Sequence, residues 1–191
     1  MSRIMTPGAL LMARGAFNLL FGLVLLTMLQ ANPSPGYSRG AFYAMTDGAL
    51  VLAFAVALMR SRERWLFPVV LADALVRLAA GAMIMTHPGM HQRIFGGAFF
   101  LSAVVVALMA VGIVGVLFVL VRKPAARDDS GAVVWLSLTP FVCTLLFGTG
   151  LAVGMLTGGE RTMLAGYAVT AGLLLVCAGH RAGRIPKPKS A

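Results

Sequence analysis

Four charged residues stand inside long apolar segments, and their types make them the first candidates for chemistry: Arg14, Asp47, Asp73 and Arg77. The segment from Val70 to Met85, VLADALVRLAAGAMIM, carries two of them. Because a charge near the centre of a bilayer costs at least about 2.5 kcal/mol on insertion scales, such a residue usually has a partner or a function. Two positive and two negative charges cancel, which favours pairing among the four.

The depth of each charge predicts which residues pair. An α-helix rises about 1.5 Å per residue, which places Arg14 and Asp73 about 10 Å from the same end of their helices. By the same count, Asp47 and Arg77 fall toward the opposite end. The sequence therefore predicts the pairs Arg14–Asp73 and Arg77–Asp47. Asp73 and Arg77 are also one turn apart on a single helix. Asn18, one turn beyond Arg14, is expected to join this network as a neutral hydrogen-bonding partner.

These charges support more than one interpretation. The favoured one is a buried ion-pair network that fixes which helices touch, because buried pairs specify geometry more reliably than they add stability. A second is a hydrated interior whose carboxylates change protonation, as intramembrane carboxylates do in proton relays. A third is a sensor in which protonation rearranges the bundle. A polar lining that continues from one face to the other would favour transport, and an isolated cluster would favour the structural role.

A separate group of candidate metal ligands lies in MIMTHPGMHQR, between the third and fourth apolar segments: His87, Met90 and His91. Thioether and imidazole groups suit Cu(I), so a copper site is one interpretation. A turn that joins two helices is the favoured one, because a proline and a glycine separate the histidines. The sequence shows no phosphate-binding glycine loop, no HExxH and no nucleophile beside a plausible base. We therefore predict a protein that is not an enzyme and has no cofactor or metal.

The elements that must position these residues are predicted to be transmembrane helices. Of 191 residues, 59% are hydrophobic and 12% are charged, which is too apolar for an ordinary soluble domain of this size. A spanning helix needs roughly 20 mostly apolar residues, and six segments meet that length: about 8–30, 40–59, 65–86, 95–121, 131–156 and 161–180. We predict an all-α integral membrane protein with a single six-helix domain over 1–180. A basic cytoplasmic tail is expected over 181–191.

The distribution of positive charge predicts the orientation of this domain. Eleven of the sixteen Lys and Arg residues lie in the two terminal segments and in the loops around 60–64 and 122–127, whereas the alternate loops hold three. Cytoplasmic loops carry such an excess, so both termini are predicted to be cytoplasmic. We therefore interpret the basic residues behind the net charge of +10 as determinants of membrane topology that also contact anionic lipids. Nucleic acid is not expected as a partner. The first segment is predicted to be retained, because LQA is a poor cleavage site for a signal peptide.

An internal repeat divides the six helices into three pairs, at about 8–60, 65–122 and 131–180. In the first helix of each pair, RGAFNLLFG (Arg14–Gly22) aligns with DALVRLAAG (Asp73–Gly81) and PFVCTLLFG (Pro140–Gly148). In the second, YAMTDGALVL (Tyr43–Leu52) aligns with YAVTAGLLLV (Tyr167–Val176). Units of two spans all enter the membrane in the same orientation, which predicts three tandem hairpins around a pseudo-threefold axis. Small residues seven apart, such as those at 15 and 22, predict close helix packing.

The sequence resembles the HdeD-like membrane proteins, a family of short two-helix repeats. The residues that carry the resemblance are Arg14-Gly15, Phe21-Gly22, Tyr43-Ala44 and Asp47-Gly48, within 12–85. In the third unit, Pro140 and Ala171 stand where the first has Arg14 and Asp47, so three equivalent sites are not expected. The resemblance implies a bacterial inner-membrane protein associated with acid or general stress resistance. A small transporter or channel is the alternative, and the sequence leaves open a homo-oligomer or an unidentified membrane partner.

Overall fold

The computed structural model describes residues 6–31, 37–60, 64–86, 98–122, 131–157 and 160–183. These residues form six α-helices and one short 3-10 helix, and no strand occurs among them: α1 (Pro7–Ala31), α2 (Tyr37–Met59), η1 (Arg64–Leu66), α3 (Phe67–Thr86), α5 (Ala98–Arg122), α6 (Gly131–Thr157) and α7 (Glu160–Gly183). The six predicted helices are thus confirmed, with bounds that differ by at most three residues. The last helix continues three residues into the segment predicted as a tail.

Local sequence explains how the first helix begins. Thr6 caps α1, because its hydroxyl oxygen accepts the N–H of Ala9 at 3.3 Å and its carbonyl accepts the N–H of Leu10 at 3.1 Å. Pro7 follows at the first helical position, where its missing N–H would have had no partner within the helix. The helix α6, in contrast, contains Pro140 in its interior and continues through it, which removes one N–H from the backbone ladder.

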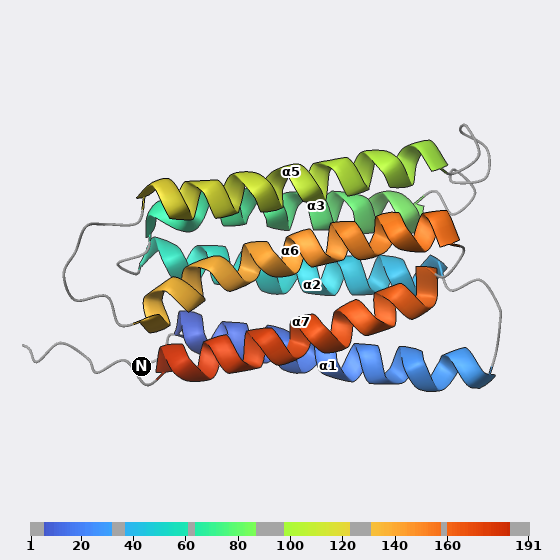
Figure 1. The fold of residues 1–191 in the computed structure, drawn as a ribbon, viewed down its shortest axis with the longest axis horizontal. Coiled ribbons are helices and arrows are strands. Elements are labelled where there is room, and N and C mark those ends of the chain that lie inside the picture. The colour runs from blue at the N-terminus through green and yellow to red at the C-terminus, as the bar shows by residue number, and fades with distance from the viewer. Residues whose placement is uncertain are drawn as a thin grey trace, which may run out of the picture.

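The six helices close into a ring in chain order. Each packs against the helices before and after it, and α1 packs along α7, which completes the ring (Figure 1). The most extensive packing joins α1 with α7 and α2 with α3. Successive helices run in opposite directions, so the blue beginning of α1 and the red end of α7 lie at the same end of the bundle (Figure 1).

Glycines allow the closest of these helices to approach. A Cβ atom at Gly15 of α1 would lie 2.7 Å from the amide nitrogen of Val176 and 2.8 Å from the carbonyl oxygen of Gly172 in α7. At Gly22, two turns further along α1, a Cβ atom would lie 2.9 Å from the amide nitrogen of Val169. The prediction that small residues seven apart line a close helix contact is therefore confirmed for α1, and this packing is how bilayer bundles gain stability.

Five of the described helices are long and apolar enough to cross a membrane: α1, α2, α3 with η1, α5 and α7. Large apolar side chains are exposed on the outside of the bundle, including Leu20, Val106 and Leu117. Such a surface is typical of a multi-pass membrane protein. The sixth predicted span is not confirmed, because the apolar stretch found in α6 is shorter and runs from Ser137 to Val153.

Candidate functional site

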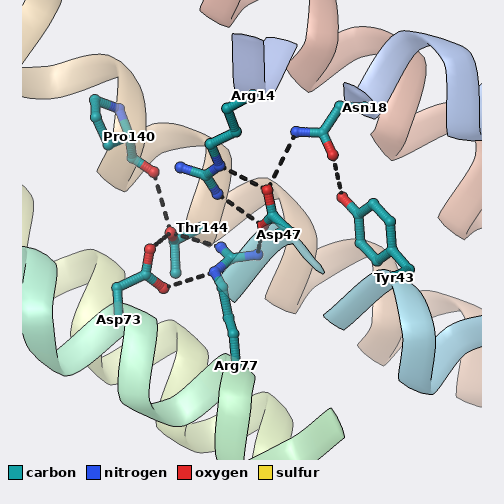
Figure 2. Close-up of polar contacts among 8 residues, drawn as sticks. All are labelled: Arg14, Asn18, Tyr43, Asp47, Asp73, Arg77, Pro140 and Thr144. Atoms are coloured by element: carbon teal, nitrogen blue, oxygen red, sulfur yellow. Dashed lines mark hydrogen bonds and ion pairs between the residues drawn. The ribbon is translucent and has the colours of Figure 1, made fainter. Parts of the chain in front are cut away.

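The five polar residues predicted to form a network meet in the interior of the bundle (Figure 2). Arg14 and Asn18 come from α1, Asp47 from α2, and Asp73 and Arg77 from α3. None of the five is more than 2% exposed. A spacing of four residues places both members of a helical pair on the same face, so α1 and α3 each aim two polar groups at the centre.

Asp47 is the centre of the network. Its carboxylate accepts two hydrogen bonds from Arg14, from Nε at 2.7 Å and from Nη2 at 2.9 Å. It also accepts one from Nη1 of Arg77 at 2.6 Å, while the amide of Asn18 lies at 3.5 Å. Two guanidinium groups therefore share one carboxylate, and the bidentate contact fixes the orientation of Arg14.

Asp73 forms the second anionic position, together with a hydroxyl group from α6. Nε of Arg77 donates to Oδ1 of Asp73 at 3.0 Å, and Nη2 of Arg77 donates to Oγ1 of Thr144 at 2.9 Å. The Thr144 hydroxyl lies 3.0 Å from Oδ2 of Asp73 and also 3.0 Å from the carbonyl oxygen of Pro140. Both carboxylate oxygens of Asp47 and Oδ1 of Asp73 thus accept hydrogen bonds from arginine, and the single proton of the Thr144 hydroxyl is shared between Oδ2 of Asp73 and the Pro140 carbonyl.

A layer of aromatic rings borders the network on the side where α1 ends. The Tyr43 hydroxyl donates to Oδ1 of Asn18 at 2.7 Å, which connects this layer to the charges. Phe21 stacks on Tyr43 with ring centroids 4.4 Å apart, and Phe147 packs on Tyr167 at 4.7 Å. The guanidinium carbon of Arg77 lies 5.2 Å from the centroid of the Phe147 ring, a favourable cation–π contact.

The structure confirms most of the predicted pairing and corrects one pair. Arg77 binds Asp47 and Asp73, and Asn18 joins the network, as predicted. The predicted pair Arg14–Asp73 is wrong, because Arg14 binds Asp47. The depth estimate failed since α2 begins at Tyr37, three residues earlier than expected, which places Asp47 near the middle of its helix. A long arginine side chain then reaches it from α1.

Sequence reasoning missed two members of the network, Thr144 and Tyr43. The repeat contained a signal for the first, because its alignment places Thr144 at the position of Asn18 in the first unit and Arg77 in the second. The first helix of every unit therefore contributes a polar side chain at this position. Tyr43 lies one turn before Asp47 on α2, where its hydroxyl reaches the same centre.

Three buried polar atoms have no hydrogen-bond partner among the residues that the structure describes: Nη1 of Arg14, Oγ1 of Thr139 and the hydroxyl of Tyr167. The first belongs to a fully buried charged group. Because Arg14 uses Nε and Nη2 to bind Asp47, its Nη1 lies on the opposite edge of the planar guanidinium group.

The polar cluster is bounded by apolar side chains along the axis of the bundle. Toward the end where α1 begins, Leu11, Leu58 and Val70 are buried, and toward the other end lie Phe21 and Phe147. Ser137 and Thr139 of α6 and the hydroxyl of Tyr167 are further buried polar groups in the described part of the chain. In that part, no polar lining runs from one end of the bundle to the other.

The predicted metal ligands His87, Met90 and His91 lie outside the described residues. Within the described ranges, no group of three or more His, Cys, Asp or Glu side chains is placed to hold a metal ion. Fold and site together define a bundle of apolar helices around a charge-neutral polar core. Comparisons with protein-family models, with curated proteins and with solved structures found no match for the chain.

Proposed function

We propose that this chain is a non-enzymatic, multi-pass protein of a bacterial inner membrane, in which the Arg/Asp network holds the helices in register. The observation that carries this proposal is the pairing within the network: both carboxylates accept hydrogen bonds from arginine inside the protein, and two arginines balance two aspartates. A buried charged network whose members are all paired specifies which helices associate. It joins α1, α2, α3 and α6 at one point.

The arrangement we propose is three helical hairpins, six spans in all, around a pseudo-threefold axis. Repeat-equivalent aromatic pairs support it, since Phe21 stacks on Tyr43 much as Phe147 packs on Tyr167, at 4.4 and 4.7 Å. A repeat-equivalent glycine contact supports it as well. A Cβ at Gly81 of α3 would touch the backbone of α2, just as one at position 22 of α1 would touch α7.

For the orientation, we propose that the end of the bundle where α1 begins and α7 ends faces the cytoplasm. Arg60, Arg64 and Arg181 are exposed there, at the end of α2, the beginning of η1 and the last turn of α7. An excess of cationic residues is the usual mark of the cytoplasmic side. Membrane lipids are the expected partners of the apolar exterior, with a second copy of the chain or another membrane protein as the alternative.

We further propose that the protein acts in acid or general stress resistance, as its resemblance to HdeD-like proteins implies. Most of the motif residues that carry the resemblance make packing or polar contacts. Arg14 binds Asp47, Gly22 lies against α7, Phe21 stacks on Tyr43, and a Cβ at Gly48 would lie 3.0 Å from the side chain of Leu78. The motif is therefore suited to building this bundle, which supports a structural role for the charges within the proposed function.

One experiment separates this proposal from a transporter or channel that uses the same charges. A strain lacking the gene is challenged with acid and complemented with the wild-type protein or with the double variant Arg14→Met/Asp47→Leu. The double variant keeps the Arg77–Asp73 pair and the overall charge balance, so a structural network should permit rescue. A double variant that is abundant and folded, yet fails to rescue, would refute the structural role and support the transport alternative. If deletion has no effect on survival, the link to stress is wrong.

A further inference from the structure

The ring is built from three helix pairs in which glycines bring the helices into close contact. A Cβ atom at Gly172 of α7 would lie 2.8 Å from the carbonyl oxygen of Gly15 in α1, and one at Gly81 of α3 would lie 2.9 Å from the amide nitrogen of Met45 in α2. One at Gly112 of α5 would lie 3.2 Å from an amide nitrogen of α6. Close approach at small residues is a main source of stability between helices in a bilayer, so each pair is a stable unit.

The contacts between these pairs are unequal. The α1–α7 and α5–α6 pairs are joined through α6 and α7, which pack on one another about as extensively as α5 packs on α6. The α2–α3 pair meets its neighbours in the ring through α1–α2 and α3–α5, the two least extensive contacts between successive long helices. Among the described glycines, no close contact crosses either of these two seams. The ring therefore divides into a four-helix body (α5, α6, α7 and α1) and a two-helix arm (α2, η1 and α3).

The arm has polar contacts of its own. Nη1 of Arg77 in α3 donates to Asp47 of α2 at 2.6 Å, and Nε of Arg77 donates to Asp73 on its own helix at 3.0 Å. The short helix η1 lies against both α2 and α3. Close packing and two ion pairs thus hold the arm together without any contribution from the body.

On one side, α1 holds the arm through an ion pair (Figure 2). Arg14 donates to Asp47 from Nε at 2.7 Å and from Nη2 at 2.9 Å, and the Tyr43 hydroxyl donates to Asn18 at 2.7 Å. The buried charges of the arm, two aspartates and one arginine, sum to −1, and Arg14 supplies the opposite charge. Because separating a buried ion pair strands both charges, any movement of the arm must keep Arg14 on Asp47.

On the other side, α6 holds the arm through a single hydroxyl group (Figure 2). Oγ1 of Thr144 accepts from Nη2 of Arg77 at 2.9 Å and lies 3.0 Å from Oδ2 of Asp73. It also lies 3.0 Å from the carbonyl oxygen of Pro140 in its own helix. A hydroxyl group has one proton to donate, so Thr144 can exchange its bond to the arm for a bond within α6 and lose no donor contact.

We propose that the α2–α3 arm moves as one piece against the four-helix body, with the Arg14–Asp47 pair as its pivot and the Thr144 hydroxyl as its latch. The movement opens the α1–α2 and α3–α5 seams, where packing is least extensive, and leaves the three glycine-lined pairs intact. A rigid-body displacement of packed helices about a few contacts is an established form of conformational change. The proposal deepens the structural role of the network and rests on it, because the contacts that set the register of the helices also set the resting position of the arm.

Distances between spin labels test the movement in the full chain, reconstituted in lipid nanodiscs. One pair of labels joins arm and body, at Leu75 of α3 and Leu173 of α7, and the control pair lies within the body, at Val106 of α5 and Leu173. All three side chains are more than half exposed on the outside of the bundle. Cys177 is exposed and is replaced by alanine, whereas Cys143 is buried and does not take up label. We expect two distances for the arm–body pair and one for the control pair.

Two threonines of α6 provide a matched pair of variants for the latch. Thr144→Val removes the hydroxyl that contacts the arm, and Thr139→Val removes a buried hydroxyl that has no partner among the described residues. Thr144→Val should raise the ratio of displaced to docked arm about fivefold, as expected for a lost hydrogen bond, and Thr139→Val should leave it unchanged. An equal effect of the two variants would contradict the latch.

A single distance for the arm–body pair in the unsubstituted protein, as narrow as that of the control pair, would overturn the movement, and this comparison decides the matter if Thr144→Val does not fold. Two distances for both label pairs would overturn the division into arm and body. A bundle that is rigid in this assay leaves the structural role of the network standing, since that role is tested separately by the survival of cells with the Arg14→Met/Asp47→Leu protein.

Discussion

Replacing each of the two aspartates by asparagine should reveal which one holds the network together. Asp47 receives three guanidinium hydrogen bonds at 2.6–2.9 Å, whereas Asp73 receives one at 3.0 Å. A hydrogen bond to a charged group contributes about 1.5–3 kcal/mol, and breaking a buried ion pair on one side costs about 3–5 kcal/mol. We therefore expect Asp47→Asn to lower the free energy of unfolding by about 4–5 kcal/mol and Asp73→Asn by about 2–3 kcal/mol.

The two variants are matched controls for one another. Each exchanges a carboxylate for an amide of nearly the same shape, each is fully buried, and each changes the net charge of the network by the same amount. A difference between their unfolding free energies therefore reflects the different hydrogen-bond partners of the two aspartates and not the loss of a charge. Equilibrium unfolding in mixed micelles should show an unfolding constant about 30-fold larger for Asp47→Asn than for Asp73→Asn. Equal losses, or a larger loss for Asp73→Asn, would refute the assignment of Asp47 as the centre.

Three other predictions address pairing, packing and topology. In a double-mutant cycle of unfolding free energies, Arg14→Met and Asp47→Leu should couple by about 2–3 kcal/mol, and Arg14→Met with Asp73→Leu by clearly less; equal coupling would contradict the observed pair. Gly172→Ala should cost about 1–3 kcal/mol because its Cβ would lie 2.8 Å from the carbonyl oxygen of Gly15. Gly166→Ala, where a Cβ would meet nothing within 4 Å, should not destabilise the protein, and a similar loss for both would contradict close packing. Reporter fusions at residues 62, 126 and 186 should indicate the cytoplasm and fusions at 36, 90 and 159 the outer side; a cytoplasmic signal at 90 would overturn the six-span topology.

The sequence was sufficient to predict the helices and the four charged residues of the network. Hydrophobic segments of spanning length leave few alternatives to helices, because a backbone without water must bond to itself. A charge within such a segment must find a partner, which is why Arg14, Asp47, Asp73 and Arg77 could be grouped before their geometry was known.

The partners of each charge could not be predicted in the same way. Counting residues from a helix end carries the uncertainty of that end, and an error of three residues at the start of α2 was enough to assign Arg14 to the wrong aspartate. Thr144 escaped notice because a threonine in an apolar helix usually bonds to its own backbone, and its place in the repeat became informative only beside its contacts with Arg77 and Asp73.

The contact of α1 with α7 has a consequence for how the chain assembles. Helix α1 is synthesised before α7 and has its largest interface with it, so the glycine-lined face around Gly15 and Gly22 has no permanent partner until α7 emerges. The pair Arg14–Asp47, in contrast, needs only α1 and α2. Assembly thus has an early electrostatic step and a late closing step of high contact order, which makes α7 the helix whose loss leaves the ring open.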